Sequence, residues 1–234
     1  MKKEDSRKVE GMDNQQFCFI ICCNNDVFLE ECLLYINQLT IPKGYSIDII
    51  TIAEADSMTE AYQAGMEASP AKYKIYLHQD VFILNKNFLI DTLEIFNNNP
   101  SIGMLGMVGS KKLPPSAVMW ESKKRIGALR SCTLNTVDDF FDIPMSEGRY
   151  SVEEVMAVDG LLMMTQYDIP WRQDLFQGWD FYDVSQSFEF RRVGYQVAVP
   201  YQKSPWVLHD CGFLNLTSYY KDRDIFVKEY NGEF

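Results

Sequence analysis

The stretch that decides the fold is Phe17-Cys18-Phe19-Ile20-Ile21-Cys22-Cys23-Asn24-Asn25, in which seven apolar residues end abruptly at two asparagines. A continuous apolar run of this length is typical of a strand that is buried on both faces, as strands of parallel sheets are. Helical periodicity follows, with apolar residues at 29, 33, 36 and 39. We expect Asp26 to cap this helix and the helix to reach Gln38.

The same alternation of strand and helix continues to about residue 110. The expected elements are strands at 47–52, 73–77 and 102–108, a helix capped by Ser57 up to residue 68, and a helix from Asn85 or Asn87 up to residue 96. The order βαβαβαβ with short connections predicts an α/β fold, with a doubly wound, mostly parallel sheet and helices on both faces. Ligands of such sheets bind beyond the carboxyl ends of the strands.

The second half of the chain has a weaker pattern. We expect strand character at 152–165, a helix at 182–192 closed by Gly194, short strands at 195–199 and 206–208, and a final helix from about 214 to 230. Residues 1–16 are expected to be a polar, mobile lead-in. Residues 17–234 are expected to form a single domain with two halves, 17–110 and 111–234.

Charge and motif content exclude several classes of protein. The chain has 22 basic and 33 acidic residues, a net charge of −11, and its longest basic cluster is Lys123-Lys124-Arg125. Such a surface repels phosphate backbones, so we expect no nucleic-acid partner. No apolar run reaches the roughly 18–20 residues that cross a bilayer, so no transmembrane segment is expected. The sequence has no P-loop motif, which disfavours a P-loop NTPase, and no GxGxxG after the first strand, which disfavours a dinucleotide-binding Rossmann site. It also has no GxSxG nucleophile elbow.

Both histidines of the chain lie within two residues of an aspartate at the end of an expected strand, in His78-Gln79-Asp80 and His209-Asp210. Imidazole together with carboxylate suits Mn²⁺ or Mg²⁺. Asp80 also stands in an apolar run, where an acid is costly to bury without a partner or a metal ion. The alternative is that the histidines are ordinary hydrogen-bonded residues and that Asp80 is a turn or capping aspartate.

The segment 171–183, WRQDLFQGWDFYD, combines two tryptophans with further aromatic residues and three aspartates. Flat aromatic faces can cover the C–H face of a sugar while carboxylates accept hydrogen bonds from its hydroxyl groups. The alternative is an aromatic loop packed over the core, which is common. Composition alone does not separate the two hypotheses.

In their order and spacing, these motifs resemble the family 2-like glycosyltransferases with a GT-A fold, over about residues 17–230. The similarity is greatest to a bacterial branch marked by a YLHQD segment, here Tyr76 to Asp80. FCFIICCNN resembles the first donor-binding strand, 58–65 the family's ARNxG helix, and 206–209 the late strand that can supply a histidine metal ligand. Asp159-Gly160 and GWDFYDVSQSFEFRRVGYQV resemble the acceptor half, with its E-D pair and a helix ending in RxxGY.

The resemblance implies an inverting, metal-assisted glycosyltransferase that uses a nucleotide-sugar donor, with a UDP-sugar favoured. It implies that Asp80 and His209 bind the divalent cation, Mn²⁺ or Mg²⁺, and that Asp183 is the general base. Asp183 begins a helix, whose N-terminus is expected to keep it ionised. The candidates for donor binding in the half 17–110 are Asn24, Glu54, Tyr62, His78 and Gln79. The candidates for binding the acceptor, a glycan, glycoprotein or lipid-linked molecule, are Trp120, Asp159, Gly160, Trp171, Trp179, Asp180 and Tyr182.

The sequence departs from the family pattern at three places. His78 stands where the D-x-D motif has its first aspartate, Tyr182 where the E-D pair has its glutamate, and 53–56 where the family has Asp-Asp-Gly-Ser. A second hypothesis therefore stays open, a non-catalytic GT-A-like module that binds a nucleotide-sugar or glycan and assists a partner transferase. A sugar nucleotidylyltransferase is disfavoured because 22–25 lacks that family's glycine and basic residues. We expect a cytoplasmic location, where a lipid-linked acceptor would bring the protein to the inner face of the membrane.

Overall fold

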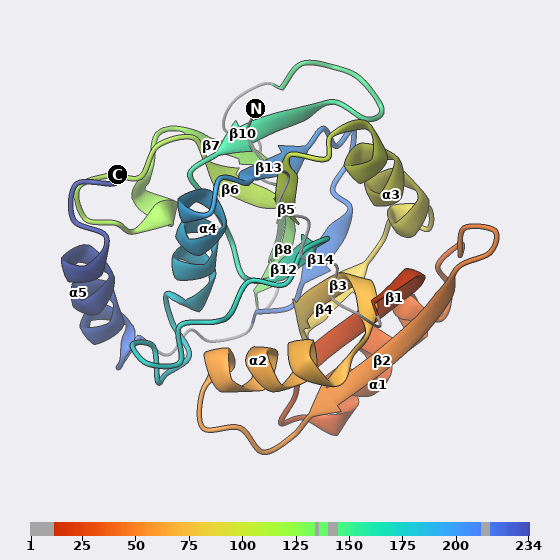
Figure 1. Cartoon of the computed structure of the whole chain (residues 1–234), viewed down its shortest axis with the longest axis horizontal. Helices are drawn as coiled ribbons and strands as arrows, with labels where there is room; N and C mark the ends of the chain where they lie inside the picture. The colour runs from red at the N-terminus through yellow and green to blue at the C-terminus, as the bar shows by residue number, and fades with distance from the viewer. Residues whose placement is uncertain (1–11, 134–135, 140–144, 212–215) are drawn as a thin grey trace, which may run out of the picture.

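The computed structural model describes residues 12–133, 136–139, 145–211 and 216–234. Within these ranges the central sheet has seven strands in the order β10-β13-β5-β12-β3-β1-β2 (Figure 1). Its strands are β1 (Asp13–Cys22), β2 (Ser46–Ile52), β3 (Ala71–His78), β5 (Ile102–Gly106), β10 (Val152–Val155), β12 (Leu162–Thr165) and β13 (Gln196–Pro200). The helices are α1 (Asp26–Ile36), α2 (Met58–Ala68), α3 (Phe88–Asn98), α4 (Tyr182–Arg192), α5 (Tyr219–Glu229) and the short 3-10 helix η1 (Met119–Glu121).

The central sheet is mostly parallel. β1 pairs in parallel with both β2 and β3, and β13 pairs in parallel with β5. β12 lies between β3 and β5 and is antiparallel to both, and β10 is antiparallel to β13. Because β12 reverses the direction twice, β5 and β13 run the same way as β1, β2 and β3. The α/β fold with a mostly parallel sheet is therefore confirmed.

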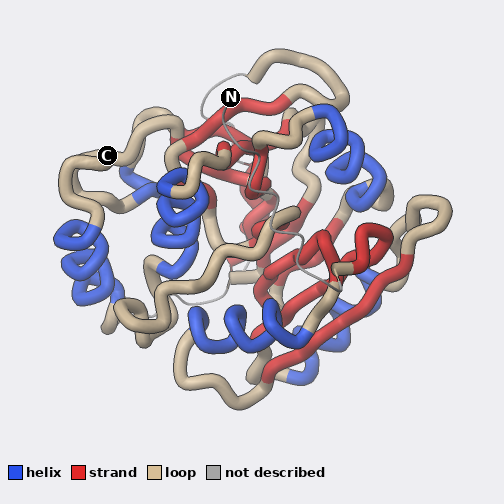
Figure 2. Tube along the Cα trace, in the orientation of Figure 1, coloured by secondary structure: helices blue, strands red, loops and turns tan. Residues whose placement is uncertain are grey.

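The two faces of β1 bury alternate side chains. Phe17, Phe19 and Ile21 pack into one core with residues of α1 and α3, whereas Cys18 and Ile20 pack into another with residues of α2 and α4. A Cβ atom on Gly65 of α2 would overlap the side chain of Ile20, so this glycine lets the helix lie close to the strand. Helices thus cover both faces of the sheet (Figure 2), as a doubly wound fold requires.

Several expected boundaries are corrected. β1 begins at Asp13, inside the range expected to be a lead-in, and residues 1–11 lie outside the described part of the chain. Asn25 rather than Asp26 caps α1, because its side chain accepts hydrogen bonds from the backbone N–H groups of Val27 and Phe28. The strand expected at 102–108 is split into β5 and β6 (Val108–Ser110), and 152–165 forms three strands, β10, β11 (Ala157–Val158) and β12. The last helix begins at Tyr219, and residues 212–215 lie outside the described ranges.

Two small sheets complete the fold. One has the order β11-β6-β7, with β7 at Arg125–Gly127. The other has the order β4-β14-β8-β9, with β4 at Val81–Ile83, β8 at Arg130–Thr133, β9 at Thr136–Asp139 and β14 at Val207–His209. β14 pairs with β4, and the backbone N–H of Asp210 donates to the Asp80 carbonyl at 2.9 Å. Among the described residues, no helix has the length and apolar character needed to cross a membrane.

Candidate active site

His78, Asp80 and His209 form a cluster of side chains where β3 and β14 end. The Asp80 Oδ1 atom lies 3.5 Å from His209 Nε2 and 3.9 Å from His78 Nδ1. One ligand atom from each residue fits within 4.8 Å of the other two. Burial opposes ionisation of Asp80, but the hydrogen bond and charge of His209 prevail and lower the pKa of the carboxyl group. Burial and the neighbouring His209 lower the pKa of His78, which favours the neutral imidazole that a metal ion binds.

The second nitrogen of His78 has a fixed partner. His78 Nε2 is hydrogen-bonded to the Tyr182 hydroxyl group at the start of α4. Tyr182 is pressed against Gly160, where a Cβ atom would overlap its hydroxyl group. The tyrosine can therefore hold the imidazole in one orientation, with Nδ1 directed to the Asp80 side. A hydrogen bond to the outer nitrogen is how proteins usually orient a metal-binding histidine.

Asp183 lies in the first turn of α4. Its Oδ2 atom accepts a hydrogen bond from the Gly160 N–H and its Oδ1 atom one from the Val184 N–H, both at 2.8 Å. We expected the helix N-terminus to keep this carboxyl group ionised. Instead, burial and the negative charge of Asp159 outweigh these hydrogen bonds and raise the pKa of Asp183 to about 7.

The residue before α4, Phe181, has a φ of 58°, in the left-handed region that side chains other than glycine rarely adopt. Its ring packs against Tyr219 and Phe226 of α5, at centroid distances of 5.0 and 5.6 Å. These contacts hold the unusual turn from which Tyr182 and Asp183 enter the site. Backbone strain of this kind persists only where the surrounding structure enforces it.

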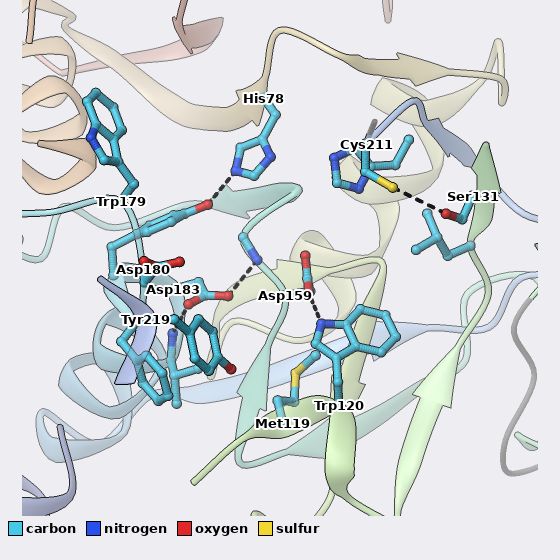
Figure 3. Close-up of a pocket in the computed structure, with 16 residues that line it drawn as sticks. His78, Met119, Trp120, Ser131, Asp159, Trp179, Asp180, Asp183, Cys211 and Tyr219 are labelled. Carbon is cyan, nitrogen blue, oxygen red and sulfur yellow. Dashed lines mark hydrogen bonds between the residues drawn. The ribbon is translucent and has the colours of Figure 1, made fainter. Parts of the chain in front are cut away.

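Asp159 and Trp120 form a further fixed pair. The Trp120 indole Nε1–H donates to Asp159 Oδ2 at 2.8 Å, and the Leu161 backbone N–H donates to Asp159 Oδ1 at 2.9 Å. Figure 3 shows this pair beside Asp183, with Trp179 and Asp180 farther along the same wall. The aspartate and the tryptophan come from segments 39 residues apart in the chain.

Two adjacent cavities meet at this site. The larger, of about 400 Å³, is shown in Figure 3 and is lined by His78, Met119, Trp120, Leu129, Ser131, Asp159, Gly160, Trp179, Asp180, Phe181, Tyr182, Asp183, Val184, His209, Cys211 and Tyr219. The smaller, of about 270 Å³, is lined by Cys22, Cys23, Asn24, Ala53, Ala55, Met58, His78, Gln79, Asp80 and Trp179. His78 and Trp179 belong to both linings, so they form the wall between the cavities.

Three of the five residues expected to bind the donor line the smaller cavity, and Glu54 and Tyr62 do not. Asn24, His78 and Gln79 line the smaller cavity. Gln79 Oε1 accepts from the backbone N–H groups of Asn24 and Asn25, both at 2.9 Å, so this glutamine joins the ends of β1 and β3. Glu54 is exposed beside that cavity, between the lining residues Ala53 and Ala55.

Two of the expected binding residues are corrected by their burial. Tyr62 is 0% exposed and Trp171 is 4% exposed, and their rings lie 5.1 Å apart in the core beneath α4. Neither lines either cavity, so Tyr62 does not contact a donor there and Trp171 does not contact an acceptor. Both support the base of Tyr182, whose ring centroid lies 5.8 Å from that of Tyr62. Trp179, by contrast, is 49% exposed and lines both cavities.

Several lining residues of the larger cavity were not predicted from the sequence. Met119, Leu129 and Ser131 come from a region without a recognisable motif, and Tyr219 comes from the last helix. Cys211 follows His209 by two residues, and its position beside a candidate ligand is the only local signal that could have identified it.

The chain is similar to known proteins in its sequence family and in its fold. A sequence model of a family described as "Glycosyltransferase like family" matches residues 18–230. No curated protein sequence matches. Among solved structures, S. aureus TarS is similar with a TM-score of 0.57 and 12% identity, over 94% of this chain and 40% of that chain. TarS 1–349 in complex with UDP-GlcNAc is similar with a TM-score of 0.55 and 10% identity, over 94% of this chain and 68% of that chain. This chain thus spans less than half of the longer TarS structure, and the likeness supports the GT-A fold.

Proposed function

Because this chain belongs to the glycosyltransferase-like family, which it matches over residues 18–230, we propose that it transfers a sugar from a nucleotide-sugar donor to an acceptor hydroxyl group. The observation that carries the proposal is that His78, His209 and Asp183 line one cavity of about 400 Å³. Metal-ligating groups and a carboxyl group with a raised pKa thereby face the same space. A cavity of this size is within the usual range for a small-molecule site.

The donor's nucleotide is assigned to the smaller cavity, because it opens at the carboxyl ends of β1 and β3, where ligands of doubly wound sheets bind. We assign the sugar end of the donor to the entrance of the larger cavity, because His78 and Trp179 line both cavities. A UDP-sugar is the favoured donor, since TarS 1–349, a structure with the same fold, has been solved with UDP-GlcNAc.

The residues present fit a divalent cation. His78 and His209 offer imidazole nitrogens and Asp80 a carboxylate, with ligand atoms within 4.8 Å of one another, and Tyr182 holds the outer nitrogen of His78. Two nitrogen ligands and one oxygen ligand suit Mn²⁺ better than Mg²⁺, which prefers oxygen. When bound, such an ion stabilises the negative charge that develops on a diphosphate leaving group.

Asp183 is the proposed general base. Its carboxylate form accepts the proton of the acceptor hydroxyl as that oxygen attacks the anomeric carbon, and the bond to the diphosphate breaks on the opposite face. A single displacement of this kind inverts the anomeric configuration. The Gly160 and Val184 N–H groups fix the carboxylate for this role. General base catalysis typically contributes about 10²–10⁴-fold to a rate.

The proposal is tested by thermal shift with a panel of nucleotide-sugars, each with and without Mn²⁺ or Mg²⁺. A donor that binds the native state raises the unfolding midpoint. We expect one donor to raise it only with the metal ion, and we expect Asp80→Ala to abolish that rise. Asp48→Ala, which makes the same change at an exposed aspartate on β2 that lines neither cavity, is the matched control.

The donor so identified is then used in transfer assays with glycan, glycoprotein and lipid-linked acceptors. Transfer by the wild type, with the product's anomeric configuration inverted, supports the proposal. Donor binding with neither transfer of the sugar nor hydrolysis of the donor would favour a non-catalytic module. Binding that does not depend on a metal ion would remove His78, Asp80 and His209 as ligands.

A further inference from the structure

The larger cavity combines three aspartates with two histidines, His78 and His209, and has no lysine or arginine in its described lining. Asp159, Asp180 and Asp183 contribute carboxyl groups, whereas the lining residues include no lysine or arginine. The whole chain has a net charge of −11, so the remainder of the surface adds to the negative potential.

Two arginines close to lining residues, Arg125 and Arg223, have partners other than the carboxyl groups of the cavity. Arg125 donates through its Nη1 atom to the Trp120 carbonyl at 2.7 Å and lies over the indole ring, 5.6 Å from the centroid. Arg223, one turn after Tyr219 on α5, is 2.6 Å from Asp224. Neither guanidinium belongs to the lining of the cavity. The carboxyl groups of the cavity therefore have no counter-charge from these residues.

The pKa values of Asp180 and Asp183 are consistent with a lining that has no lysine or arginine. Burial raises the pKa of Asp180, although the Ser218 hydroxyl group donates to its Oδ2 at 2.8 Å. Burial and then Asp159 raise the pKa of Asp183 to about 7. A lysine or arginine beside these carboxyl groups would lower both pKa values. A phosphate or carboxylate group that entered the cavity would add a like charge where the existing ones are already costly.

The rest of the lining is largely aromatic and aliphatic. Trp120 and Trp179 lie on different sides of the carboxyl groups in Figure 3, and Tyr219 stands near Asp183. Met119, Leu129, Phe181 and Val184 complete the apolar part. Aromatic faces next to hydrogen-bond acceptors suit a ring that has C–H groups on one face and hydroxyl donors at its edge.

Building on the proposed function, we infer that the acceptor is an uncharged saccharide and that this cavity rejects acceptors bearing phosphate, sulfate or carboxylate groups. Its rings cover the C–H face of the sugar, and Asp180 and Asp159 accept hydrogen bonds from its hydroxyl groups. Discrimination comes from like-charge repulsion inside a partly buried site, which costs more there than in water. The inference concerns the acceptor side alone, since the donor's diphosphate is assigned to the cluster of His78, Asp80 and His209 and to the smaller cavity.

The first test is equilibrium binding of the full-length protein, without donor, to an array of neutral, sialylated, sulfated and phosphorylated glycans. Binding confined to neutral glycans supports the inference. Binding to anionic glycans, or to none, overturns it. This result does not depend on catalysis, so it is separate from the donor screen that tests the proposed function.

The second test uses a matched pair, p-nitrophenyl β-glucoside and β-glucuronide, which differ by one carboxylate, together with the corresponding galactose pair. We expect the neutral member of a pair to bind or accept sugar at least about tenfold better at low salt, and the ratio to fall as salt is added. Asp180→Asn should reduce the ratio, because it removes one negative charge and keeps the size of the side chain. Asp48→Asn changes the net charge equally at a distant exposed position and should leave the ratio unchanged. An equal preference for both members, or a ratio that Asp180→Asn does not change, overturns the inference.

Discussion

Replacing Asp183 with asparagine should remove transfer activity and at the same time stabilise the protein above neutral pH. Burial raises the pKa of Asp183 from 3.8 to about 7, so the folded state binds this proton more tightly than the unfolded state does. The stabilisation that results is complete below the unfolded pKa and is lost as pH rises through the folded pKa. Three pH units correspond to about 4 kcal/mol at about 1.4 kcal/mol per unit, the most that asparagine can recover at pH 8. For a chain of this length that is a rise of about ten degrees in Tm.

The pH dependence separates this effect from ordinary changes in packing. At pH 5 the folded wild type is already protonated at Asp183, so the advantage of Asp183→Asn should be smaller by about 3 kcal/mol than at pH 8. Wild-type transfer should fall about tenfold between pH 8 and pH 6, as the base is protonated, and the variant should lose about 10²–10⁴-fold at pH 8. Thermal melts at pH 5 and pH 8 and initial rates of transfer measure both effects, with Asp48→Asn as the control. A variant that keeps transfer would exclude Asp183 as the base, and a difference in Tm from the wild type that is the same at pH 5 and pH 8 would exclude the raised pKa.

Three further substitutions test the cluster and its support. Asp80→Ala should lose the rise in Tm that Mn²⁺ gives the wild type, and an unchanged rise in a melt with titrated Mn²⁺ would exclude the carboxylate as a ligand. Tyr182→Phe removes the hydroxyl group bonded to His78 and should weaken Mn²⁺ binding by roughly 10–100-fold in a calorimetric titration, whereas equal affinity would show that this bond does not orient the imidazole. Gly160→Ala places a methyl group against the Tyr182 hydroxyl and should cost about 1–3 kcal/mol in urea unfolding, a loss that identical unfolding curves would contradict.

The fold could be predicted from the sequence where its signals are local. The apolar run of β1 and the Ser57 cap of α2 each act within a few residues, and both are found in the structure. The position of β12 has no such signal. Residues 162–165 are apolar in either arrangement, and their antiparallel place between β3 and β5 depends on partners more than 50 residues away. Strand pairing of this kind is set by tertiary packing.

The candidate site was predictable to a similar extent. The resemblance implied Asp80 and His209 as metal ligands and His78 as a donor-binding residue, and polar residues at the strand ends of a doubly wound sheet are expected to converge on one edge. The structure brings these three residues together in one cluster. Trp171 and Trp179 could not be distinguished in the same way, since they share one aromatic segment and only one of them is buried beneath α4. The ionisation of Asp183 was mispredicted for a related reason. The helix N-terminus is visible in the sequence, whereas the burial and the nearby Asp159 that outweigh it are not.

The two motif departures that seemed separate in the sequence are one feature of the structure. By the family resemblance, His78 and Tyr182 each stand where an acidic residue is expected, and their side chains are hydrogen-bonded to each other. Two carboxylates in this contact would repel each other unless a cation lay between them, whereas an imidazole and a phenol pair without one. Relative to the family pattern, the exchange removes one negative charge from the cluster of His78, Asp80 and His209 and one from its neighbour at position 182. It leaves Asp80 as the carboxylate among the described members of the cluster. A site with two imidazoles depends on the orientation of its rings more than on its charge, and the short path from Gly160 through Tyr182 to His78 supplies that orientation.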